Sequence, residues 1–226
     1  MLSCAVAFCG FIALGTWQVH RLSWKLDLIE RVNARVNAPP VAPPPRTQWA
    51  QVGKDQEYLH VCLKGSYLHA KETYVQAVTV KGPGFWVMTP MQQADGTLVT
   101  INRGFVTAGQ KDPTVRDNAQ LAGETQVCGL LRLTEPGGGF LRRNDPAQAH
   151  WYSRDVVAMA AQQYLPIQSV APYFIDADAQ ANPGGVPVGG LTVIKFHNSH
   201  LVYAFTWYGL ALLSLVAGVL VFRYRR

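Results

Sequence analysis

The chain has 226 residues, of which 49% are hydrophobic and 15% are charged, and its formal net charge is +6. Its basic residues are scattered, and no predicted helix carries the lysine and arginine stripe that nucleic-acid binding uses, so we expect no nucleic-acid partner. A mean hydropathy of +0.05 averages two apolar ends and a middle of ordinary soluble composition. The composition favours a membrane protein with one extramembrane domain.

The first apolar segment covers residues 2–19 and carries no charged side chain, about enough to cross a hydrocarbon core of about 30 Å. No basic residue precedes it and bulky residues end it, unlike a cleaved signal peptide. We predict a first transmembrane helix over residues 1–21. Its abrupt start at Met1 suggests that a few residues are missing before it.

An amphipathic continuation of this helix is predicted over residues 22–38, because apolar side chains recur there at helical spacing among charged ones. The five prolines between positions 39 and 45 stop it, since proline removes an amide donor and clashes with helical continuation. We assign residues 39–57 to a proline-rich linker.

The middle of the chain, residues 58–198, is predicted to be one strand-rich α+β extramembrane domain. Alternating apolar and polar residues with β-branched and aromatic enrichment indicate strands. We expect strands over residues 58–68, 72–80, 84–91, 97–105, 125–133, 172–176 and 191–195. Asp95-Gly96 is typical of a hairpin turn. A helix is expected from Ser153 or Asp155, either of which would cap it, through about Tyr164.

The four cysteines separate into two pairs. Cys4 and Cys9 fall in the first apolar segment, where we interpret them as packing residues. Cys62 and Cys128 lie in the domain, which would face an oxidising space, so a disulfide between them is one of the alternatives that the sequence leaves open.

The second apolar segment, residues 201–222, has no charged side chain and is followed at once by Arg223. We predict a second transmembrane helix over residues 199–222 and a cytoplasmic basic tail over 223–226. Two spans place both termini on one side, and the arginine tail favours the cytoplasm. Basic residues just after the first span argue the other way, but the rule weakens for long translocated loops.

Catalytic motifs are mostly missing from the sequence. It has no nucleophile elbow, zinc-protease motif, phosphate loop or dinucleotide fingerprint. His150 oriented by Asp145 would be the one conceivable base, in a membrane-anchored hydrolase. Asn144-Asp145-Pro146 is more typical of a turn, so we expect that the protein is not an enzyme.

His200, at the start of the second apolar helix, is the strongest candidate for function. Helical spacing places a band of residues below it, namely Tyr203, Ala204, Trp207, Ala211 and Ser214. On the first helix, Trp17, Gln18 and Arg21 share a face at the same end of the membrane. One interpretation is an aromatic belt with small-residue helix packing. The other is a planar apolar cofactor between the helices, with His200 as axial ligand of haem iron.

Several segments, in order along nearly the whole chain, resemble signatures of the surfeit-locus cytochrome c oxidase assembly family. They are residues 14–21 with Trp24 and Lys25, 101–106, 144–146 with 151–160, 172–176, and 189–193 leading into 198–210. Two positions depart from the family pattern: Ser199 stands where asparagine is common, and Phe105 where tryptophan is common. Neither departure removes the histidine of the closing signature, which falls on His200.

The resemblance implies an assembly factor of the respiratory chain in the cell inner membrane, multi-pass, with its main domain periplasmic and both termini cytoplasmic. It implies a chaperone that binds haem a non-covalently and passes it from haem A synthase to cytochrome c oxidase subunit I. His200 would ligate iron, Trp17, Tyr203 and Trp207 would wall the pocket, and Gln18 and Arg21 would hold polar substituents or propionates. A homo-oligomer in which two histidines share one iron is left open.

The alternative function is a haem-free scaffold that stabilises an assembly intermediate of oxidase subunit I. In that case Arg103 and the surface of residues 144–155 would contact the partner.

Overall fold

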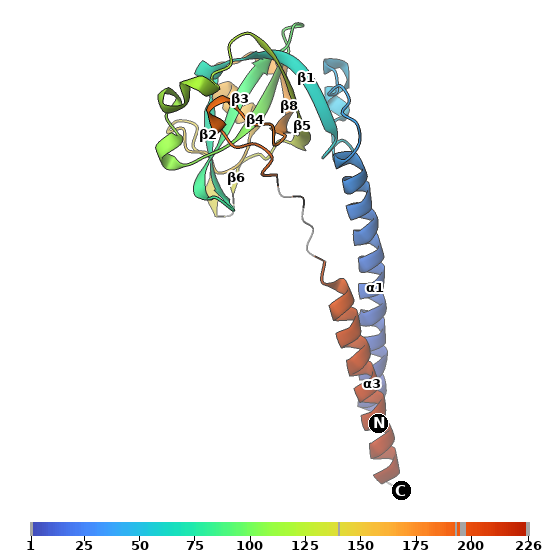
Figure 1. Cartoon of the computed structure of the whole chain (residues 1–226). Coiled ribbons are helices and arrows are strands. Elements are labelled where there is room, and N and C mark those ends of the chain that lie inside the picture. The colour runs from blue at the N-terminus through green and yellow to red at the C-terminus, as the bar shows by residue number, and fades with distance from the viewer. Residues whose placement is uncertain (1, 140, 193, 195–197, 225–226) are drawn as a thin grey trace. The chain divides into compact units, whose positions relative to one another are not determined.

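The computed structural model describes residues 2–139, 141–192, 194 and 198–224 (Figure 1). The chain divides into two compact units. One contains the two long helices, from Met1–Ala34 and Ile194–Arg226, and the other is the domain formed by Arg35–Val193.

The helical unit consists of α1, Leu2–Val36, and α3, His200–Tyr224. Helix α1 has 35 residues and runs without a break from the apolar segment into the amphipathic one. Among the described residues, only α3 is both long and apolar enough to cross a membrane. The second predicted span therefore has support, and the crossing of α1 stays a prediction.

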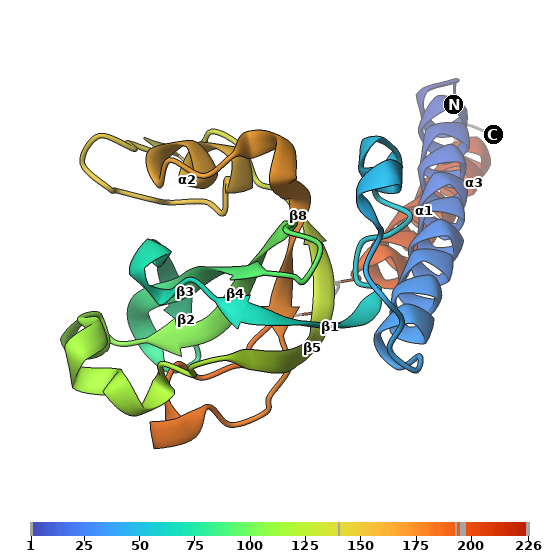
Figure 2. The same ribbon diagram turned by 90° about the horizontal axis from the view of Figure 1, so that it is seen from above.

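The domain is a six-stranded sheet with the order β1-β5-β8-β4-β3-β2. Its strands are β1 (His60–Tyr67), β2 (Thr73–Thr79), β3 (Gly82–Gln92), β4 (Leu98–Val106), β5 (Glu124–Leu133) and β8 (Val170–Ala177). Strand β1 also pairs with β3, which closes five strands into a barrel and leaves β2 on the outside. All neighbours are antiparallel except β4 and β8. Figure 2 shows the curved sheet from above.

The strand-rich character predicted for the domain is confirmed, because six of the seven expected strands form. The seventh, residues 191–195, does not: Leu191, Thr192 and Ile194 are not in a strand, and residues 193 and 195 lie outside the described residues. The Thr192 hydroxyl instead donates to Asp176 Oδ2, 3.0 Å away.

The other regular elements are short. The expected helix is α2, Val156–Gln162, and Asp155 caps it by accepting from the Ala158 amide. Two dipeptides, β6 (Gly138–Gly139) and β7 (Arg142–Arg143), pair as a small hairpin that was not predicted.

Two hydrophobic clusters occupy opposite faces of the sheet. Tyr173 and Ile175 of β8 point to one cluster and Phe174 to the other, as the period of two requires. The second cluster contains Trp151 and Met159 and lies under α2. Every residue of β4 is buried, because both faces of this central strand are covered.

The segment predicted as a proline-rich linker packs onto the barrel. The Pro44 carbonyl accepts from the Tyr173 hydroxyl at 2.9 Å and from the Trp49 indole at 3.1 Å. Val41 forms a parallel bridge with Val61 of β1. These bonds attach the start of the domain to its sheet.

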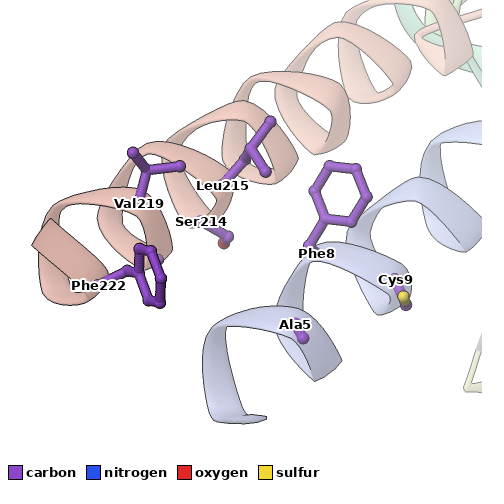
Figure 3. Close-up of a pocket in the computed structure, with 8 residues that line it drawn as sticks. Ala5, Phe8, Cys9, Ser214, Leu215, Val219 and Phe222 are labelled. Atoms are coloured by element: carbon purple, nitrogen blue, oxygen red, sulfur yellow. The ribbon is translucent and has the colours of Figure 1, made fainter. Parts of the chain in front are cut away.

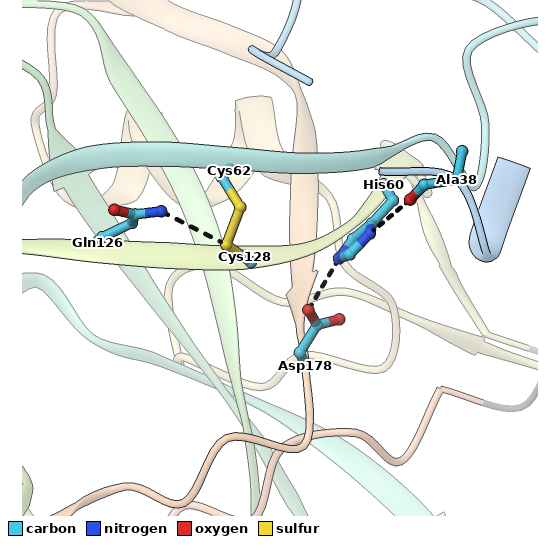
Figure 4. The surroundings of a disulfide bond; sticks show 6 residues. All are labelled: Ala38, His60, Cys62, Gln126, Cys128 and Asp178. Atoms are coloured by element: carbon cyan, nitrogen blue, oxygen red, sulfur yellow. Dashed lines mark hydrogen bonds and ion pairs between the residues drawn. A yellow bond between two sulfur atoms is a disulfide. The ribbon is translucent and has the colours of Figure 1, made fainter. Parts of the chain in front are cut away.

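Cys62 and Cys128 form a disulfide, which the sequence had left open (Figure 4). The two residues are directly opposite each other on β1 and β5, with their Cα atoms 4.1 Å apart. Close to it, His60 Nε2 lies 2.9 Å from Asp178 Oδ2, and His60 Nδ1 lies 3.1 Å from the Ala38 carbonyl.

Candidate functional site

His200 is the first residue of α3 and contacts α1 through its imidazole. Its Nδ1 lies 2.7 Å from Oε1 of Gln18, whose side chain is buried. When the Gln18 amide presents its oxygen to the ring, Nδ1 is the donor and a neutral imidazole has its lone pair on Nε2. A histidine that binds metal through one nitrogen usually donates its other N–H to an acceptor in this way. The pair is thus arranged to offer Nε2 as a ligand.

The helices pack closely along the next two turns below His200. Phe11 and Trp207 stack with their ring centroids 5.7 Å apart. The Tyr208 ring lies against Gly15, where a Cβ atom would come within 2.7 Å of the ring, so a larger residue here would force the ring to shift. The small side chains of Ala204 and Ala211 are also buried here.

The structure brings together some of the sequence-predicted site residues and separates others. Gln18 meets His200, while Trp207 contacts Phe11 rather than another predicted residue. Arg21 stacks on Trp24, with Cζ 4.7 Å from the ring centroid. Trp17 and Tyr203 are each 54% exposed, so they do not form an enclosed wall in this chain alone.

Two contacts between the helices were missed from the sequence: the Phe11–Trp207 stack and the approach of Tyr208 to Gly15 and Thr16. The sequence did contain the information for these contacts, because two antiparallel helices that meet at positions 18 and 200 also meet at positions 11 and 207. This relation could be used only after one contacting pair was known.

Towards the other end of the two helices lies an apolar cavity of about 410 Å³ (Figure 3). It is lined by Ala5, Phe8, Cys9, Ser214, Leu215, Gly218, Val219 and Phe222. The lining has no charged side chain, and the Ser214 hydroxyl is already bonded to the Leu210 carbonyl at 2.9 Å. Such a cavity suits a hydrocarbon chain and disfavours a charged group.

Comparison with known proteins covers both helices and the domain. A model of the SURF1 family matches residues 5–212. Surfeit locus protein 1 of Homo sapiens is 38% identical over 215 residues, which span 88% of this chain and 69% of the human protein. The Takifugu rubripes protein of the same name is 34% identical, over 87% of this chain and 86% of its own length. The chain belongs to the SURF1 family. This family is generally known for cytochrome oxidase assembly factors.

The SURF1 domain contains a buried ionic cluster that sequence reasoning did not find. Glu72 accepts from Arg103 Nη1 at 3.1 Å through one carboxylate oxygen and from Arg116 Nη2 at 2.8 Å through the other. The three side chains are at most 3% exposed. Burial opposes ionisation of Glu72, but the bonds and charges of Arg116, the Tyr74 hydroxyl and Arg103 outweigh it and lower the Glu72 pKa.

The burial of Arg103 shows that one expectation, a surface position for this side chain, is wrong. In the scaffold alternative this side chain would contact a partner, yet it is fully buried because Glu72 and the Ala119 carbonyl bind its guanidinium group. No group of three or more histidine, cysteine or acidic residues able to hold a metal ion occurs in the part of the SURF1 chain that the structure describes.

The segment around Asp145 and His150 forms the expected turn. The two residues pair through both backbone hydrogen bonds, at 2.8 and 2.9 Å, and the Asp145 carboxylate accepts from the Gln148 amide. The Asn144 side chain accepts from the backbone amides of Tyr152 and Ser153. These hydrogen bonds show that the polar residues of this segment stabilise a turn.

Proposed function

We propose that this chain is a membrane-anchored assembly factor for haem-copper oxidase that binds haem a and assists its delivery to oxidase subunit I. The observation that carries the proposal is the hydrogen bond between Gln18 and His200 Nδ1, which would leave Nε2 available to bind a metal. Membership of the SURF1 family supports the assembly role.

The residues present fit a haem group. His200 would ligate the haem iron and Gln18 would fix the imidazole ring, while Trp17, Tyr203 and Trp207 would offer apolar surface. Arg21, exposed at the same end of α1, would pair with a propionate. The apolar cavity between α1 and α3 would suit a long hydrocarbon tail, which haem a carries and which haem b, with only methyl and vinyl groups as its hydrocarbon substituents, lacks. The whole haem group would be cargo for the oxidase, and this chain would hold it without a catalytic step of its own.

We place the chain in the cell inner membrane as a multi-pass protein, with the domain periplasmic and both termini cytoplasmic. The disulfide supports this placement, because such bonds persist in oxidising compartments and are rare in the cytosol. In this setting haem A synthase would be the donor and subunit I the acceptor, with both reached through the lipid bilayer.

A second candidate, a haem-free scaffold for subunit I, is favoured by the exposure of Trp17 and Tyr203. Aromatic side chains left open on a pair of membrane helices offer packing surface to a third helix. The two candidates differ in whether the purified protein carries haem.

The test is a pyridine-haemochrome spectrum of the protein purified after expression with haem A synthase. We expect an a-type spectrum for the wild type, its loss in His200→Ala, and haem affinity reduced about 10–100-fold in Gln18→Ala. His20→Ala, an exposed histidine on the same helix as Gln18, is the matched control and should keep the haem.

An unchanged spectrum in His200→Ala would refute the ligand assignment. A wild-type protein without haem that still co-purifies with subunit I would instead establish the scaffold.

A further inference from the structure

Two neighbouring hairpins of the domain expose aliphatic side chains almost completely. Val78, at the end of β2, and Val80, in the turn to β3, are 85% and 92% exposed, and Leu141, between β6 and β7, is 89% exposed. A single exposed aliphatic side chain is ordinary, but three almost fully exposed aliphatic side chains at the ends of two neighbouring hairpins suggest an apolar partner.

The two tips form one surface. Arg142 Nη1 donates to Gln76 Oε1 at 3.2 Å, which ties β7 to β2. A groove of about 470 Å³ between them is lined by Val78 of one hairpin and by Gly139 and Arg142 of the other. Figure 1 shows β2 and β6 at the same end of the domain.

The charge on this surface has one sign. Lys81, Arg142 and Arg143 are exposed beside the three aliphatic residues. Neither residues 76–86 nor residues 137–143 include an aspartate or glutamate. We name these six residues, Val78, Val80, Lys81, Leu141, Arg142 and Arg143, the tip patch. Aliphatic side chains flanked by cations are the combination that anionic lipid surfaces attract.

The chain leaves the domain at the same end. Val188 pairs with Phe105, and Phe105 pairs with Trp86, only a few residues from the β2–β3 turn. Gly104 allows this contact, because a Cβ atom there would lie 2.2 Å from the Val188 carbonyl oxygen. From Gly190, which is still bonded to Ala177, ten residues reach α3 and span at most about 35 Å when extended.

We propose that the tip patch rests on the membrane surface, with its aliphatic side chains among the lipid headgroups and its three cations on anionic lipid phosphates. The occupant is the bilayer that α3 crosses, because the short connection keeps this end of the domain within reach of it. The proposal does not depend on haem binding.

The experiment places a bimane label at Val80→Cys in the full-length protein, with Cys4 and Cys9 changed to serine and the disulfide intact. The protein is reconstituted into phosphatidylcholine vesicles that contain phosphatidylglycerol and lipids with brominated acyl chains. We expect stronger bromine quenching than for a label at Val157→Cys. Val157 is 48% exposed on α2, which packs beside Val170 at the beginning of β8, away from the exit of the chain.

Charge reversal tests the electrostatic half of the proposal. Lys81→Glu with Arg142→Glu should lower the quenching at position 80, and so should removal of phosphatidylglycerol. A label at Leu141→Cys repeats the measurement on the other hairpin, and retention of the disulfide checks that each variant is folded. Equal quenching at positions 80, 141 and 157 would overturn the proposal and would leave the tip patch to a protein partner.

Discussion

Glu72 binds two guanidinium groups inside the domain, so the three side chains depend on one another. If the carboxylate is replaced, Arg103 and Arg116 become buried cations without a counter-ion. Removing one partner of a buried ionic group is far more costly than the net worth of the group, because the remaining charge stays desolvated.

We therefore predict that Glu72→Gln lowers the free energy of unfolding by about 3–5 kcal/mol. Thermal unfolding followed by near-UV circular dichroism in detergent measures the change. Glu124→Gln is the matched control, because Glu124 is exposed at the start of β5. It should change stability by less than about 0.5 kcal/mol. Equal melting of the two variants would show that the cluster contributes little.

His60 predicts a pH dependence of stability. Burial lowers its pKa, but the hydrogen bonds to Asp178 and to the Ala38 carbonyl, together with the Asp178 charge, outweigh burial and raise the pKa above the ordinary value. A raised folded-state pKa stabilises the protein below the unfolded pKa of about 6.5, and this contribution is lost as the pH rises through the folded-state pKa.

As the pH rises from about 6 to about 8, the free energy of unfolding should therefore fall less in the His60→Asn variant than in the wild type. Urea midpoints at the two pH values measure the difference. Gln148→Asn, at an exposed position, removes no titratable group and should keep the wild-type slope. A wild-type slope in His60→Asn would mean that its ion pair with Asp178 is not coupled to folding.

At the scale of elements, the disulfide joins two strands that are far apart in sequence. Cys62 and Cys128 are 66 residues apart, so the bond closes a long loop in the unfolded chain. In the chain-entropy description a loop of this length corresponds to about 4 kcal/mol.

Replacing both cysteines by serine should lower stability by up to about 4 kcal/mol, and reductant should destabilise the wild type similarly. Thermal unfolding with and without reductant measures both effects. Cys9→Ser keeps the disulfide and should retain the response to reductant. A double variant as stable as the wild type would show that the barrel needs no cross-link.

The sequence predicted where strands and helices occur better than it predicted which of them lie side by side. Strands such as β1 and β5 were found because their side chains alternate, and α2 because Asp155 is a good cap. The insertion of β8 between β5 and β4 was not predictable, since alternation does not identify a strand's partner. Likewise, His200 was predicted as the candidate ligand from its place and neighbours, but its bond to Gln18 needed the helix pairing. The Glu72 cluster was hidden because Arg116 comes from the irregular 3₁₀ segment Pro113–Ala119.

For the whole molecule, the proposed topology makes a direct prediction. Alkaline phosphatase needs an oxidising compartment to form its disulfides. Fused after Arg226 it should be inactive, because the arginine tail favours the cytoplasm. Inserted between Gly184 and Gly185, in a loop of the domain, it should be active.

Enzyme activity in cells, normalised to protein level, is the measurement. Insertion between Gly109 and Gln110, in another exposed part of the domain, is the control and should match the first insertion. An active fusion after Arg226 would contradict cytoplasmic termini, and would mean that α1 and α3 do not both cross the membrane as proposed.

The parallel pairing of β4 with β8 also determines when the domain can fold during synthesis. Strand β8 lies between β5 and β4, so the barrel cannot close until residue 177 has left the ribosome. Only 22 residues then separate β8 from α3. By the time the barrel has its last strand, nearly the whole chain has been made, so the domain can complete its fold only as α3 follows it out of the ribosome.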